Sequence, residues 1–198
     1  LDAWGIKRLE LAGYEADDII GTLAKKAEAL GYKVYIVTGD RDALQLISDQ
    51  TTVLLTKRGI KEIEAVDRTR LYEQYQLTPE QIIHLKGLMV DSSDNIPVVP
   101  GVGEKTALKL LHKHNSIAEL YQNLDQEKGK LKERLEANKG QALLSRELAA
   151  IDCQVPLEID FDTEPERDAE QLIALFQELE FASLIERVAQ ATEHLAGL

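Results

Sequence analysis

The sequence has a single cysteine, Cys153, among 198 residues. One thiol cannot form an internal disulfide and has no partner for a cysteine-based zinc site, so we expect a buried, inert thiol in a protein of the reducing cytoplasm. No apolar run approaches the roughly 20 residues that a membrane-spanning helix requires, and no basic segment followed by an apolar one opens the chain. The sequence therefore argues against a membrane protein and against a secreted one.

Glycine and proline are also scarce, with 12 and 5 residues, and the chain has no low-complexity tract. With 44% hydrophobic and 29% charged residues, the composition excludes collagen and fibrous repeats and argues against a disordered chain. The length is typical of one fair-sized globular domain or of two small ones.

Positive charge is rare near the C-terminus. Residues 151–198 contain 12 acidic and 2 basic residues, whereas residues 1–150 contain 23 acidic and 21 basic residues. The formal net charge of −12 is thus mostly a property of the last quarter of the chain. The near-neutral remainder can bind nucleic acid through local clusters of lysine and arginine.

The hydrophobic pattern predicts an α/β part followed by a helical part. Apolar residues at helical spacing predict a helix over 15–30, and a β-branched segment predicts a strand over 33–38. The short link between them is typical of a parallel βαβ unit, and strands over 52–56 and 60–66 are expected to form a hairpin. Further helices are predicted over 1–12, 67–75, 78–90, 103–114, 116–122, 126–138, 140–151, 168–179 and 182–189.

Seven acidic residues stand at the ends of predicted elements: Glu15, Asp17, Asp18, Asp40, Asp42, Asp91 and Asp94. They belong to a helix N-terminus, a strand end and a loop, and the carboxyl ends of strands are where open α/β sheets bind ligands. Each group alone can be explained as a helix-dipole complement, a turn or a cap, but the three together favour one shared cluster. Such carboxylates repel one another and favour Mg²⁺ or Mn²⁺. Two such ions would activate a water molecule and stabilise the leaving oxygen of a phosphodiester.

A glycine-rich turn opens the helix predicted over 103–114. The turn 101–103 leaves backbone N–H groups free to bind a phosphate, although an ordinary corner between two helices is the alternative. It is not a Walker A loop, because Glu104 separates Gly103 from Lys105. Three lysines continue the positive charge along the helix: Lys105, Lys109 and Lys113. Four later basic residues can contact a DNA backbone, but they alternate with glutamates, which favours a solvated helix face instead: Lys128, Lys130, Lys132 and Arg134.

Three ordered motifs carry a resemblance to a known family. Residues 15–18 read Glu-Ala-Asp-Asp, residues 38–42 read Thr-Gly-Asp-Arg-Asp, and the third motif begins Asp-Ser-Ser-Asp at 91 and ends Gly-Glu-Lys-Thr-Ala at 107. In this order and spacing they resemble the 5′ nuclease (5′→3′ exonuclease) domain of bacterial DNA polymerase I, which belongs to the flap endonuclease family. The sequence departs from that family's pattern at Val90 and Val98, where glycine is expected.

This resemblance implies a PIN-like α/β nuclease core with a mainly parallel sheet over 1–90 and a helix–hairpin/three-turn–helix DNA-binding part over 91–189. Residues 190–198 would begin a linker to a polymerase region. The implied metal ligands are Glu15, Asp17, Asp18, Asp40, Asp42, Asp91 and Asp94, with catalytic roles for Asp17, Asp18 and Asp40. The implied DNA-binding residues are Ser92, Ser93, Gly101, Val102, Gly103, Lys105, Thr106 and Lys109.

The resemblance also implies two Mg²⁺ or Mn²⁺ ions, a K⁺ ion at the hairpin turn, and DNA with 5′ flaps, nicks or gaps as the substrate. The protein is expected to act as a monomer at the bacterial nucleoid, in primer removal and repair. The family's first strand, with a metal-binding Asp, and its arch do not precede Leu1. The chain is therefore expected to be the C-terminal two-thirds of the nuclease domain.

Two other functions fit the sequence. Without the N-terminal ligands and the arch, this segment can be a structure-specific DNA-binding module that has no activity. A metal-dependent ribonuclease of the PIN-like group is the second alternative, and the hairpin element argues against it.

Overall fold

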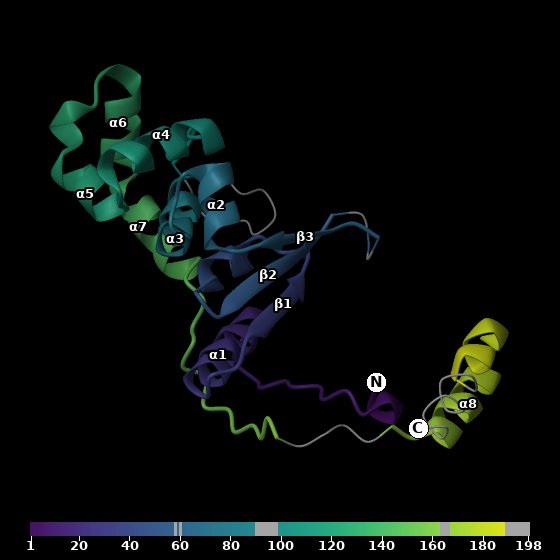
Figure 1. Ribbon diagram of the computed structural model, residues 1–198. Coiled ribbons are helices and arrows are strands. Elements are labelled where there is room, and N and C mark those ends of the chain that lie inside the picture. Colours follow the sequence, from purple (N-terminus) through teal and green to yellow (C-terminus); the bar gives the residue numbers. More distant parts are fainter. Residues whose placement is uncertain (58, 60, 90–98, 163–166, 189–198) are drawn as a thin grey trace. The chain divides into compact units, whose positions relative to one another are not determined.

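The computed structural model describes residues 1–57, 59, 61–89, 99–162 and 167–188 (Figure 1). Packing divides the chain into two compact units, one formed by Tyr14–Pro156 and one that combines Leu1–Gly13 with Leu157–Leu198. No helix within the described ranges is both long and apolar enough to cross a membrane. The predicted division into a nuclease core over 1–90 and a DNA-binding part over 91–189 concerns function and not packing, and it stays a prediction.

The larger unit begins with α1 (Ala16–Ala29), β1 (Val34–Thr38) and the 3₁₀ helix η2 (Asp42–Leu46) (Figure 1). Two further strands follow, β2 (Thr51–Thr56) and β3 (Ile63–Val66). β1 pairs with β2 in parallel, and β2 pairs with β3 antiparallel. The α/β class and the β2–β3 hairpin are therefore confirmed, and the described part of the sheet is mixed.

One face of the sheet is buried. Thr51, Val53 and Leu55 alternate with more exposed residues along β2, as expected for a strand with one face in the core. Ile36 of β1 and Val66 of β3 are buried with them. The turn after β1 therefore starts from a firmly held strand, and this turn carries Asp40 and Asp42.

The rest of the larger unit is helical (Figure 1). Four of its helices each contain a completely buried leucine, Leu71, Leu88, Leu111 or Leu135, as expected of helices that pack one apolar face on a core. In chain order the elements are α2 (Arg68–Tyr75), α3 (Pro79–Leu88), α4 (Glu104–His114), α5 (Ile117–Gln122), η3 (Leu124–Gln126), α6 (Gly129–Ala137) and α7 (Lys139–Leu148).

Two glycines allow close packing around the end of α7. A Cβ atom at Gly87 of α3 would lie 2.7 Å from the Cβ of Arg146 on α7. A Cβ atom at Gly21 of α1 would lie 2.8 Å from Cγ2 of Ile151 and 2.9 Å from Sγ of Cys153. Because real Cβ contacts are never this short, only glycine lets α3 and α1 approach α7 and the segment that follows it.

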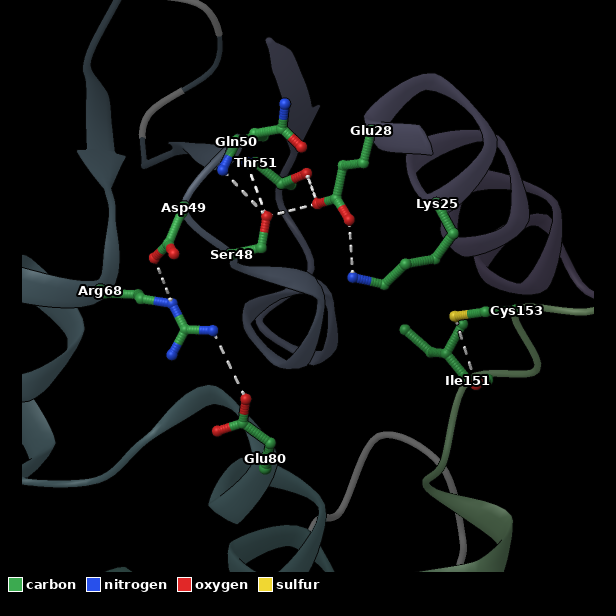
Figure 2. A network of polar contacts seen from close by, with 10 residues as sticks. All are labelled: Lys25, Glu28, Ser48, Asp49, Gln50, Thr51, Arg68, Glu80, Ile151 and Cys153. Carbon is green, nitrogen blue, oxygen red and sulfur yellow. Dashed lines mark hydrogen bonds and ion pairs between the residues drawn. The ribbon is translucent and has the colours of Figure 1, made fainter. Parts of the chain in front are cut away.

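A polar network joins α1 to the loop before β2 (Figure 2). The carboxylate of Glu28 accepts hydrogen bonds from the hydroxyls of Ser48 and Thr51 and pairs with Lys25 at 2.9 Å. These bonds hold the pKa of Glu28 below its usual value, although burial opposes the shift. Cys153 lies nearby, partly buried, and burial raises the pKa of its thiol. A raised pKa agrees with the expected inert thiol.

The smaller unit has its own core of Ala3, Leu172, Phe176 and Val188. Its described elements are η1 (Asp2–Trp4), α8 (Ala169–Glu178) and a helical segment over 182–188. The N–H of Asp168 donates to the carbonyl of Ala3 at 3.0 Å, and the guanidinium of Arg167 lies 5.1 Å from the ring centre of Trp4. The first residues of the chain thus pack with a segment more than 150 positions away.

The helix predicted over 1–12 is wrong. Only η1 forms, and it ends at Gly5, whose φ of 68° is left-handed and breaks the helical run. Ile6 and Leu9 remain exposed, so no core contact supports a helix after Gly5. Elsewhere the differences are at the ends: α3 stops at Leu88, α7 stops at Leu148, and the helix predicted over 126–138 forms as α6, which begins only at Gly129.

Candidate active site

An open cleft of about 600 Å³ lies in the larger unit where α1 begins and β1 ends. Acidic side chains from both elements line it, and the end of α7 with the segment after it forms the opposite wall. The lining residues are Glu15, Asp17, Asp18, Asp40, Asp42, Glu147, Leu148, Ala149, Ala150, Ile151 and Asp152. The structure thus brings together five of the seven predicted acids.

The first turn of α1 is built as a capping box. The N–H of Glu15 donates to Oδ2 of Asp18 at 3.1 Å, and the Glu15 side chain accepts a bond from the backbone of Asp18 in return. The N–H of Asp152 donates to Oδ1 of Asp18 at 2.8 Å. Asp18 therefore fixes both the helix end and the opposite wall of the cleft, while Asp17 takes part in neither bond.

The turn after β1 is also held by short-range bonds. The N–H of Asp42 donates to Oδ1 of Asp40 at 2.9 Å, and the N–H of Asp40 donates to Oγ1 of Thr38 at 3.0 Å. These are the local bonds expected of a polar turn. The carboxylate of Asp42 forms an ion pair with Lys86 of α3, and both side chains are mostly buried.

The acids of the two elements interact electrostatically. The pKa of Asp17 is raised above its ordinary value, first by partial burial and then by the negative charges of Asp40 and Asp42. Glu15 and Asp18 contribute in the same direction. Mutual repulsion of this kind is what a bound divalent cation would relieve, and the donor atoms are carboxylate oxygens, which suit a hard cation.

The predicted cluster is incomplete in the described part of the chain. Asp91 and Asp94, with Ser92 and Ser93, lie outside the described residues. Among the residues that are described, no three His, Cys, Asp or Glu side chains stand close enough to hold a metal ion by themselves. The metal-binding role of the seven acids therefore stays a prediction.

Three residues at or beside the cleft carry no signal in the sequence. Glu147 and Asp152 line it, and Lys86 pairs with Asp42. Gln45 of η2 holds the segment that carries Glu147 and Asp152. Its amide donates to the carbonyl of Ala149 and accepts from the N–H of Ile151, both at 3.0 Å. No motif or spacing marks these contacts, which join positions more than 100 residues apart.

The predicted phosphate-binding turn precedes α4. Val102 is completely buried, and its N–H donates to the carbonyl of the equally buried Val99 at 3.1 Å. Gly101 has a φ of 75°, a conformation that favours glycine, and Gly103 is the N-cap of α4. The buried side chains of Val99 and Val102 thus anchor the turn in the core, while Gly101 and Gly103 are exposed.

The lysines of α4 divide into two groups. Lys105 and Lys109 are exposed, as predicted for DNA contacts, and Thr106 is partly buried between them. Lys113 instead pairs with Glu127 at 2.6 Å, so its charge is compensated within the protein. The expectation that the positive face extends to Lys113 is therefore wrong.

Comparison with family models decides the family. Residues 1–76 match the model "5'-3' exonuclease, N-terminal resolvase-like domain", and residues 77–172 match "5'-3' exonuclease, C-terminal SAM fold". The chain belongs to the 5′-3′ exonuclease family. The family predicted from the three motifs is thereby confirmed.

Several bacterial DNA polymerases I are similar to this chain in sequence. The chain is 51% identical to DNA polymerase I of Bacillus subtilis over 193 residues, which are 96% of this chain and 22% of that protein. It is 43% identical to the thermostable DNA polymerase I of Thermus thermophilus over 185 residues, 93% of this chain and 22% of that protein. The chain spans about a fifth of the length of these relatives.

Solved structures share the fold. T5 5′-exonuclease, described with bound zinc, matches with a TM-score of 0.62 and 23% identity over 73% of this chain and 52% of that one. The catalytic core of Rad2 in complex with a DNA substrate matches with a TM-score of 0.56 and 17% identity over 89% and 59%. At these identities the likeness establishes the fold alone, and the predicted fold class is confirmed.

Proposed function

We propose that this chain acts as a divalent-metal-dependent 5′ nuclease, which cleaves phosphodiester bonds of DNA near 5′ ends and flaps. The observation that carries the proposal is the convergence of acids from the start of α1 and the end of β1 in one open cleft. The family supports the same activity, and structures of T5 flap endonuclease and Rad2 are described with DNA.

The cleft would hold Mg²⁺ or Mn²⁺ through Glu15, Asp17, Asp18, Asp40 and Asp42, joined by Asp91 and Asp94. Bound divalent ions supply an activated water molecule and neutralise the charge that develops on the leaving oxygen. The protein's own task is to keep the ligands in place. Asp18 ties α1 to the segment after α7, and Lys86 pairs with Asp42. Asp17 and Asp40 line the same cleft.

The Gly101–Gly103 turn with Lys105 and Lys109 would bind the duplex beside the cleavage site. Contacts to phosphates carry no base information, so binding is expected to be independent of sequence. Ser92, Ser93 and Thr106 belong to the same predicted surface, with K⁺ at the turn. Val102 does not, because its side chain is completely buried and its N–H is bonded to the carbonyl of Val99. The substrates would be flapped, nicked or gapped duplexes, met by a monomer at the nucleoid during primer removal and repair, within a DNA polymerase I.

A cleavage assay with 5′-labelled flap DNA and Mg²⁺ tests this function. We expect cleavage by the parent and none by Asp40→Asn, while both bind the flap DNA equally in Ca²⁺. Binding in Ca²⁺ without cleavage in Mg²⁺ would favour the inactive DNA-binding module. Faster cleavage of single-stranded RNA than of flap DNA would favour the PIN-like ribonuclease.

A further inference from the structure

The guanidinium group of Arg134 lies directly against the Gly101 turn, although the two residues belong to different elements. A Cβ atom at Gly101 would lie 2.5 Å from Nη1 of Arg134 and 3.2 Å from its Cζ. A side chain at position 101 would force the guanidinium to move away from this point. The sequence favours a solvated helix face for Arg134. Its side chain is exposed, and the structure places the guanidinium beside the turn.

Arg134 is held in this position by its own helix. Leu135, the next residue of α6, is completely buried, so the helix is anchored beside the turn. The carbonyl of Arg134 accepts bonds from the backbone and side-chain amides of Asn138, which end the helix. On the other side, the buried Val99 and Val102 hold the turn. The guanidinium and the turn are thus two neighbouring groups on well-packed supports.

The charge of Arg134 is not compensated within the described part of the protein. The side chain is exposed, and its guanidinium has no hydrogen bond or ion pair with any described residue. Neighbouring basic residues differ: Lys132 pairs with Asp125 at 3.2 Å, and Lys113 pairs with Glu127. Lys132 and Arg134 of α6 therefore differ, because only the charge of Lys132 is paired within the described part of the protein.

The turn also offers hydrogen-bond donors beside Arg134, namely the backbone N–H groups at the start of α4. α4 starts at Glu104 with Gly103 as its N-cap, and no side chain caps it. The N–H groups at the start of a helix have no partner within the helix. A guanidinium is a planar fork of N–H donors that matches two oxygens of a phosphate.

We propose that Arg134 binds a backbone phosphate of duplex DNA together with the Gly101–Gly103 turn, and so extends the DNA-binding surface from α4 to α6. This rests on the proposed function, in which the turn contacts DNA. Arg134 would contribute charge and two directed hydrogen bonds, without reading the base sequence.

Measurement of DNA affinity against salt concentration tests the proposal, with the 198-residue chain and two unrelated duplexes in Ca²⁺. Each phosphate contact contributes about 0.9 to the slope of log affinity against log salt. We expect Arg134→Ala to make that negative slope shallower by about 0.9 on both duplexes. Lys132→Ala removes the same charge from the same helix and is expected to keep the parent slope, because Lys132 is already paired with Asp125.

A double-mutant cycle localises the effect. Gly101→Ala adds a methyl group where Nη1 of Arg134 lies. We expect this change to make the salt slope shallower in the parent background and to leave it unchanged in the Arg134→Ala background. Melting temperatures of all variants confirm folding.

Three results would overturn the proposal, and they differ in kind. If the parent binds DNA and Arg134→Ala keeps the same slope as Lys132→Ala, Arg134 makes no phosphate contact and the proposed function stands. If the parent itself shows no salt-dependent binding to either duplex, the proposed DNA-binding function fails, and the role of Arg134 fails with it. A loss confined to one duplex would also contradict it, since it indicates base recognition.

Discussion

The N–H of Asp152 donates a hydrogen bond to Oδ1 of Asp18 at 2.8 Å, across 134 positions of the chain. The other oxygen of Asp18 accepts the N–H of Glu15, so one carboxylate caps α1 and fastens the segment after α7. Both walls of the acidic cleft therefore depend on the same side chain.

Asp18→Ala is expected to destabilise the chain by about 1–2 kcal/mol, because it removes an N-terminal cap and a long-range hydrogen bond. Asp18→Asn, which keeps one carbonyl oxygen, should cost less. Urea unfolding at pH 7 without metal measures both. Equal stability of Asp18→Ala and the parent would show that the carboxylate does not hold the cleft walls together.

Asp17→Asn is expected to stabilise the metal-free chain at pH 7. The raised pKa of Asp17 means that its ionised form is disfavoured by folding, through burial first and then through Asp40 and Asp42. The gain in melting temperature should shrink as the pH falls below the ordinary pKa of an aspartate, because the carboxyl is then protonated in both states. Asp125→Asn, a change at a fully exposed carboxylate, is the control. A lower melting temperature for Asp17→Asn at pH 7 would contradict the repulsion.

Gly87→Ala is expected to destabilise the chain by roughly 1–3 kcal/mol, because the added methyl group would press on Arg146 and separate α3 from α7. Gly140→Ala is the matched change on α7, where nothing lies within 4 Å of the new atom, and it should be neutral or stabilising. Thermal unfolding of the two variants distinguishes packing from helix propensity. Equal effects would mean that the close approach of the helices is not required.

Glu64 is expected to stabilise the fold at neutral pH and not at strongly acidic pH. Hydrogen bonds from Lys57, at 2.6 Å, and from Arg70, at 2.8 Å, lower the pKa of Glu64 to about 2. A carboxyl with a depressed pKa stabilises the folded state above its unfolded pKa, and the contribution is lost as the pH falls from about 4.5 to about 2. The urea midpoint of Glu64→Gln should therefore lie below that of the parent at pH 6, and the two should converge toward pH 2.5. A difference independent of pH would refute the ionic origin.

Much of the fold could be predicted from the sequence, because local signals and packing agree. Acidic residues before an apolar periodic run predicted α1, a β-branched run predicted β1, and Thr78-Pro79 marked the start of α3. The failure at 1–12 has a local cause as well. Apolar residues there suggested a helix, but Gly5 adopts a left-handed conformation and the following residues have no core to pack on.

The site could be predicted only in part. The positions of Asp17 and Asp40 follow from the ends of the elements that carry them, and the structure places both in the cleft. The positions of Lys86, Glu147 and Arg134 depend on how distant helices pack, which no spacing in the sequence encodes. For Arg134 in particular, the alternating glutamates indicate a solvated helix, and only the folded structure brings its guanidinium beside Gly101.

Binding of Mn²⁺ to the 198-residue chain tests the central claim, the shared metal-binding cleft, most directly. The signal of free Mn²⁺ in electron paramagnetic resonance measures it at pH 7. The account predicts saturable binding of up to two ions that Mg²⁺ displaces, strongly weakened in the Asp17→Asn/Asp40→Asn double variant and unchanged in Asp125→Asn. No saturable binding by the parent, or parent-like binding by the double variant, would contradict the account.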